Sequence, residues 1–162
     1  MRVATTACLV ETYGTGLEVV RVEVTVEDGM ERFGFAGPYA PPVNAVRALR
    51  DRVRWGIVAS DLPWPRLHIR VATWPALRQI DPAIDLAVAI GVVEAASIAD
   101  VAVDDSVLLV GTIDKRGLVR GIPGISVEVA ERMADRHGFA DAIVGNGLMS
   151  IGHFVRHAAM VA

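Results

Sequence analysis

Residues 81–97 place the strongest constraint on the fold, because they form a long apolar segment that opens with helix-start signals. Asp81 is a residue type that caps helices, and Pro82 suits the first helical position, where an N–H group has no partner to lose. No charged residue occurs from Leu86 to Val93, and the apolar residues fall on every side of a helix. A soluble helix that is apolar all round must be surrounded by other elements. The segment therefore predicts a central buried helix.

The composition indicates a single domain over residues 1–162 with a substantial core. Hydrophobic residues make up 52% and charged residues 22%, a balance that excludes general disorder. The net charge is −3, so no global basic field recruits phosphates and we expect no strong nucleic-acid binding. The single cysteine, Cys8, excludes an intrachain disulfide and a multi-cysteine metal site.

The sequence also predicts a cytoplasmic protein with no membrane span. Arg2 is followed by a short apolar patch that ends at Glu11, which is not the pattern of a signal peptide. Residues 81–97 are borderline in length for a span, and Asp85 and Glu94 lie inside their ends.

Hydrophobic periodicity predicts an α/β (α+β) fold, a mixed sheet with packed helices. Residues 17–27 alternate valine with polar residues, which is typical of a half-buried strand, and Asp28-Gly29 is a hairpin signal. We therefore expect residues 30–36 to return as the partner of strand 17–27. The other predicted strands are 2–10, 67–74, 106–113, 118–122 and 140–144, with an acidic turn at 100–105, and the predicted helices are 43–60, 81–97, 126–137 and 150–160.

Three segments resemble the N-terminal domain of the magnesium-chelatase-subunit-I-like (ComM-type) AAA+ proteins, and more distantly the proteolytic domain of Lon. Gly37 followed by the Arg-rich helix 43–58 is similar to that family's glycine-led segment and first helix. The run Ile84–Gly91 is similar to its Phe-Asp-Leu-Pro-Ile-Ala-Leu-Gly run, and Leu109–Gly124 resembles its Gly-Glu-Leu-Ser-Leu-Asp-Gly hairpin. The resemblance covers about residues 3–160 and implies the Lon-protease-domain-like fold, which the second domain of a ribosomal protein shares.

The departures from that family limit what the resemblance implies. The turn before the central helix is Lys-Glu-Gly-Ser-Gly in the family and reads Arg78–Pro82 here, and Thr112 replaces the hairpin glutamate. No Gly-x-x-x-x-Gly-Lys-Ser/Thr motif occurs, so we predict no AAA+ ATPase module and no cofactor.

Lon's Ser–Lys dyad is absent at the matching positions. The resemblance places the serine at about Ala83 and the lysine at about Glu128. The sole lysine, Lys115, falls in a predicted reversal, where the ammonium stays solvated and makes a poor base. We therefore predict that the domain is catalytically inert.

Asp85, Arg120 and Glu128 are the pocket candidates for the alternative, a divergent peptidase or small-molecule enzyme at the N-terminal end of the central helix. The simpler interpretation of Asp85 is that it caps the helix or favours its dipole. The simpler interpretation of Arg120 is an ion pair with an acidic neighbour.

Other polar residues suggest sites only weakly. His153 and His157 lie four apart on the predicted closing helix, but zinc takes three or four ligands, so we predict no metal site. Arg47, Arg50 and Arg54 share a helix face that Asp51 interrupts by pairing with its helix neighbours, which favours a solvated surface over a phosphate site. The tryptophans, Trp55, Trp64 and Trp74, are expected in the core or an interface.

These observations favour a stand-alone, catalytically inert binding or assembly module. Its mean hydropathy of +0.41 is high for a small domain and leaves apolar surface for a protein partner or for self-association. The resemblance makes an AAA+ ATPase one such partner. The alternatives are the divergent enzyme and, by analogy with the relatives and from the Arg face, a nucleic-acid accessory factor.

Overall fold

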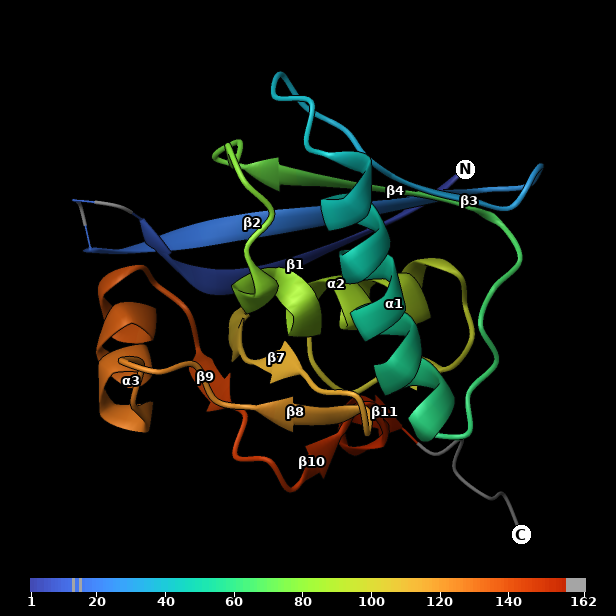
Figure 1. Ribbon diagram of the computed structural model, residues 1–162. Coiled ribbons are helices and arrows are strands. Elements are labelled where there is room, and N and C mark those ends of the chain that lie inside the picture. Colours follow the sequence, from blue (N-terminus) through green and yellow to red (C-terminus); the bar gives the residue numbers. More distant parts are fainter. Residues whose placement is uncertain (13, 15, 157–162) are drawn as a thin grey trace, which may run out of the picture.

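The computed structural model describes residues 1–12, 14 and 16–156 and confirms the mixed α/β class (Figure 1). Its main sheet has six strands in the order β3-β4-β2-β1-β6-β9. The β1–β2 and β2–β4 pairs are antiparallel, and the β3–β4, β1–β6 and β6–β9 pairs are parallel. The strands are β1 (Arg2–Thr12), β2 (Gly16–Glu27), β3 (Arg32–Phe35), β4 (His68–Trp74), β6 (Val107–Val110) and β9 (Asp141–Val144).

Three α-helices cover the two faces of this sheet: α1 (Val43–Ala59), α2 (Asp85–Ala95) and α3 (Val127–Arg136). Alternate side chains of β1 point to opposite faces, as the strand geometry requires. Cys8 and Val10 join the larger core with α1 and α2, whereas Ala7 and Leu9 join a smaller core with α3. The helices predicted at 43–60 and 126–137 are confirmed within one or two residues at each end.

The predicted central helix is confirmed as the element around which the larger core is built. It begins with a short 3-10 helix, η1 (Pro82–Ile84), and the Asp81 carboxylate caps it by accepting a hydrogen bond from the Ala83 N–H group (2.8 Å). Every residue of the following helix α2 is buried except Glu94. The Thr6 hydroxyl of β1 donates to the Ala87 carbonyl oxygen (2.8 Å), which fixes α2 on the main sheet.

A second, three-stranded sheet packs against the side of α2 that faces away from the main sheet. It contains β7 (Thr112–Ile113), β8 (Leu118–Arg120) and β10 (Met149–Ser150), in the order β10-β8-β7. Helix α1 also packs against α2, so protein surrounds the apolar helix on all sides. This arrangement is the physical consequence of a helix with no polar face.

The predicted pairing of residues 30–36 with strand 17–27 is wrong. Strand β4 lies between β2 and β3, and β3 pairs with β4 in parallel. Ile69 and Val71 of β4 are buried, so this longer strand pairs with β2 along its whole length and leaves the four-residue β3 at the edge. The signal at Asp28-Gly29 marks a turn but not a two-residue hairpin.

The single strand predicted at 106–113 is divided in two at Gly111. Strand β6 belongs to the main sheet and β7 to the three-stranded sheet. A Cβ atom at Gly111 would lie 2.6 Å from Val119 Cγ1 and 3.0 Å from the Arg120 carbonyl oxygen. Because only glycine permits this close approach, the chain leaves the main sheet at that residue.

The closing helix predicted at 150–160 is also wrong for the part that the structure describes. Residues Ile151–Phe154 form one 3-10 turn, η2, and Val155–Arg156 form strand β11. Strand β11 pairs with β5 (Asp100–Val101), which begins the segment predicted as an acidic turn. Ile151 and Phe154 are buried from a single turn, so a longer helix is not needed to cover this side of the core.

We predict that Gly91→Ala destabilises the fold although alanine is the better helix former. A Cβ atom at this position in α2 would lie 2.6 Å from Val24 Cγ2 and 3.2 Å from Val24 Cβ of β2. Overpacking of this kind costs about 1–3 kcal/mol, which exceeds the gain of about 1 kcal/mol in helix propensity. Urea unfolding of the variant should show the lower free energy.

Gly34→Ala is the matched control, because a Cβ atom there meets no heavy atom within 4 Å. Its free energy of unfolding should stay within about 0.5 kcal/mol of the wild-type value. A Gly91→Ala variant as stable as the wild type would contradict the close packing of α2 on β2.

Candidate functional site

Asp85, the first candidate of the sequence analysis, lies in a buried ion pair at the start of α2. Its Oδ2 atom accepts hydrogen bonds from Arg52 Nε of α1 (2.8 Å) and from the Ile113 N–H group of β7 (3.1 Å). The Asp85 side chain is fully buried, and the Arg52 side chain is 19% exposed. One carboxylate thus joins α1, α2 and the three-stranded sheet, which is a structural role.

Burial raises the pKa of Asp85 to about 6, although the hydrogen bond and positive charge of Arg52 and the Ile113 N–H group act in the opposite direction. Its second oxygen, Oδ1, is buried without a hydrogen-bond partner in the described structure. A carboxylate with one unpaired oxygen is costly to keep ionised in a core.

The sequence analysis did not identify Arg52 as the partner of Asp85. It grouped Arg47, Arg50 and Arg54 as one face, but Arg52 lies three residues after the buried Leu49 and so turns toward the core. That spacing is the signal that was available. The predicted pairing of Asp51 with its helix neighbours is wrong, because Asp51 pairs with the adjacent Arg50 (2.9 Å).

Arg120 lies on β8 and pairs with Asp114, whose Oδ2 atom accepts from Arg120 Nε (2.6 Å). Asp114 Oδ1 also accepts hydrogen bonds from the Arg116 and Leu118 N–H groups, which closes the turn between β7 and β8. Arg120 is exposed, so the expected ion pair with an acidic neighbour describes it well.

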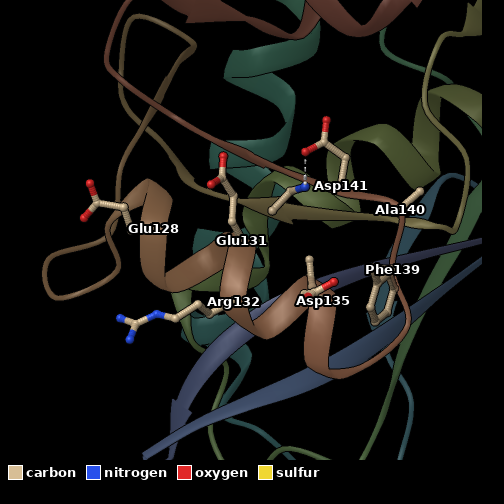
Figure 2. Close-up of a pocket in the computed structure, with 9 residues that line it drawn as sticks. Glu128, Glu131, Arg132, Asp135, Phe139, Ala140 and Asp141 are labelled. Atoms are coloured by element: carbon tan, nitrogen blue, oxygen red, sulfur yellow. Dashed lines mark hydrogen bonds between the residues drawn. The ribbon is translucent and has the colours of Figure 1, made fainter.

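Glu128 lies on the exposed face of α3, beside a surface hollow of about 450 Å³. Figure 2 shows the labelled residues of this hollow, which we call the α3 hollow. Its apolar residues include Ala134, Phe139 and Ala140, and its charged residues are Glu128, Glu131, Arg132, Asp135 and Asp141. Residues 128, 131, 132 and 135 share one face because they are three, four and seven positions apart.

The three candidates therefore do not converge on one pocket in the described structure. Asp85 contacts Arg52 and Ile113, Arg120 contacts Asp114, and Glu128 borders the α3 hollow. A general base needs a substrate hydroxyl within hydrogen-bond reach, and these three residues surround no common space that would hold one.

The positions of the Ser–Lys dyad hold no nucleophile. Ala83 is buried at the start of the central helix. Ser126 caps α3, with its hydroxyl oxygen accepting from the Val129 N–H group (3.2 Å). Lys115 is exposed in the β7–β8 turn. Burial raises the pKa of the Cys8 thiol, so this buried cysteine stays protonated.

The start of the central helix does border an open hollow, of about 1060 Å³, between the end of the β1–β2 hairpin and residues 75–82. Its charged residues are Glu11, Glu18, Arg78 and Asp81. Asp81 is occupied as a cap, and the Arg78 guanidinium lies over the Tyr39 ring, 5.1 Å from its centroid. This hollow contains none of the predicted site residues.

Two adjoining hollows at the C-terminal end of α1, of about 560 and 500 Å³, share Arg54 and Val58. Their larger apolar side chains are Trp55, Val58, Leu62 and Trp64. Val58 is 50% exposed and Trp55 37%. Trp64 packs on Phe33 of β3, with ring centroids 6.3 Å apart. We call this region the α1-end surface.

The α1-end surface is basic, unlike the chain as a whole. Its cations are Arg54, Arg66, Lys115 and Arg116, against the two carboxylates of Asp51 and Glu31. The β7–β8 turn reaches α1 through Gly117, where a Cβ atom would lie 2.5 Å from the Trp55 carbonyl oxygen. This backbone contact brings the cations of the turn beside Arg54. The sequence pattern indicates Trp55, Trp64, Arg54 and Lys115 separately, but it does not show that they lie on one surface.

The two-histidine metal hypothesis has no support from the described residues. The Ser150 N–H group donates to His153 Nδ1 (2.8 Å), and His157 lies outside the described residues. Within residues 1–12, 14 and 16–156, no group of three His, Cys, Asp or Glu is placed to hold a metal ion. None of the helices in this part of the chain has the length and hydropathy that a membrane crossing requires.

Comparison with protein families gives a match over most of the chain. The family model described as subunit ChlI of Mg-chelatase matches residues 22–147. The matched range runs from β2 to the loop after β9 and contains all three helices. No curated protein matches the chain.

We predict that the titration of Asp85 makes the fold less stable as the pH rises. The folded-state pKa of about 6 exceeds the ordinary value of 3.8, so between these pH values the folded state holds a proton that the unfolded state has released. The free energy of unfolding should therefore fall across this window, by up to about 3 kcal/mol from this group.

Asp85→Asn isolates this contribution from those of the other carboxylates, because it removes one titrating group and keeps the shape of the side chain. The wild-type free energy of unfolding, minus that of the variant, should fall between about pH 4 and pH 7 in urea titrations. Parallel pH profiles for the two proteins would contradict the raised pKa.

Proposed function

The chain belongs to the family of subunit ChlI of Mg-chelatase, and from this membership and its surface we propose that it is a catalytically inert binding or assembly module. The observation that carries the proposal is the α1-end surface, where exposed Trp55 and Val58 adjoin a group of cations. Tryptophan and arginine are the residue types that contribute most to protein interfaces.

The state of the potential catalytic groups supports the inert part of the proposal. Asp85 is sealed in an ion pair, Ser126 caps a helix, and Ala83 has no nucleophile. Nucleophilic catalysis needs a nucleophile and a base in mutual contact, and none of these residues supplies such a pair. The cytoplasmic location stays a prediction.

The partner is proposed to be a protein. The resemblance to AAA+ proteins makes an AAA+ ATPase the first candidate for a separate partner, since no P-loop motif occurs in these 162 residues. The carboxylates of Asp51 and Glu31 lie among the cations of the α1-end surface. They would repel the phosphates of a nucleic acid bound there.

The inert character is tested with unfolded casein and a serine-directed fluorophosphonate probe. We expect neither cleavage nor labelling, because no hydroxyl among the described residues is paired with Glu128 and Ser126 is occupied as a cap. A Ser126→Ala variant is the control. Cleavage or labelling of the wild type that disappears in this variant would show a relocated active site and refute the proposal.

The binding function is tested by affinity capture in the native host, with identification of retained proteins by mass spectrometry. Arg54→Glu/Val58→Glu should reduce the specific capture at least about tenfold, because it places negative charge on the α1-end surface. Val43→Glu/Arg47→Glu is the matched control, since it makes the same changes on exposed residues at the other end of α1. Equal capture by both variants would refute this surface as the binding site.

A further inference from the structure

The described part of the chain carries a second charged surface that is complementary to the α1-end surface. The α3 hollow has four carboxylates, Glu128, Glu131, Asp135 and Asp141, against one cation, Arg132. In Figure 1 helix α3 lies on one side of the molecule, and the C-terminal end of α1 lies on the other. The two surfaces are therefore too far apart to meet within one chain.

The charged residues of both surfaces are accessible to a second copy. Beside its charged residues the α3 hollow is lined by Ala134, Phe139, Ala140 and Ala142, and it is open to solvent. The β7–β8 turn carries two exposed cations, Lys115 and Arg116, which line the α1-end surface beside Arg54. Exposed cations on one surface and an open, acidic hollow on the other are electrostatically complementary.

We infer that the α1-end surface of one copy of this chain binds the α3 hollow of a second copy, so that the domain assembles head to tail. This inference rests on the proposed function and identifies the partner of the α1-end surface as a second copy of the chain. Asp51 and Glu31 favour this occupant over a nucleic acid, because an acidic protein face can place its own arginine, Arg132, against a carboxylate.

A contact between two different surfaces is not closed by two copies. Each bound copy still presents one free α1-end surface and one free α3 hollow, so the assembly grows into a ring or an open filament. A symmetric dimer would instead stop at two copies, and the experiment uses this difference.

The experiment measures mass by sedimentation equilibrium at low and high salt. The wild type should form species larger than the 17.3 kDa monomer, and its association should weaken at least about tenfold as salt screens the charges. Arg54→Glu/Arg116→Glu and Glu131→Gln/Asp135→Asn should each weaken association by a similar factor.

Mixing these two variants is the decisive arm. The first keeps an intact α3 hollow and the second keeps an intact α1-end surface, so one productive contact is left. The mixture should form a 1:1 pair and stop there. The matched controls are Arg2→Glu/Arg32→Glu and Glu18→Gln/Asp28→Asn, which make the same changes on exposed residues outside both surfaces and should associate like the wild type.

Three results would overturn the inference. One is a wild type that stays monomeric at low salt, and another is a mixture that forms no pair although each variant is folded by circular dichroism. The third is submicromolar binding of labelled single-stranded DNA at physiological salt that Arg54→Glu/Arg116→Glu abolishes, without self-association. A monomeric wild type that still captures a different protein through the α1-end surface would leave the proposed function intact and reject the second copy as its occupant.

Discussion

One buried carboxylate connects three of the elements that enclose the larger core. Asp85 is the polar group that ties α2 to α1 through Arg52 and to β7 through the Ile113 N–H group. Apolar contacts alone would allow these elements to slide, because the hydrophobic effect is not directional. A paired charge in the core adds little net stability, but it allows few alternative positions. We infer that Asp85 sets the register in which α1 and the three-stranded sheet enclose the central helix.

The elements with a clear period were predictable from the sequence. The alternation of valines in β2 and the uninterrupted apolar run of α2 both follow from which sides of an element are buried. The pairing of β3 was not predictable in this way, because a turn signal does not say which strand lies next in the sheet. The strand break at Gly111 could not be predicted either, because it is caused by a tertiary contact with Val119. The single turn η2 buries Ile151 and Phe154, and no local sequence pattern predicts that the helix ends there.

The candidate site was predictable only in pieces. The start of the central helix suggested Asp85, but its depth of burial and its partner Arg52 are properties of the tertiary structure. Trp55 and Trp64 were expected in the core or an interface, and the structure places both beside one surface. The cations of that surface come from α1, from the segment before β4 and from the β7–β8 turn. Residues so distant along the chain form a common field only after folding.

The contact of Gly117 with the Trp55 backbone has a consequence for the kinetics and entropy of binding. With a φ angle of 79° and no side chain, Gly117 holds the β7–β8 turn directly against α1. The Asp114 carboxylate braces the same turn from inside through two backbone N–H groups. A turn constrained at both places loses little conformational freedom when it meets a partner, and such preorganisation raises affinity without adding any contact. In the proposed assembly, the freedom to exchange between carboxylates is left to the side chains of Lys115 and Arg116, while the backbone stays in place.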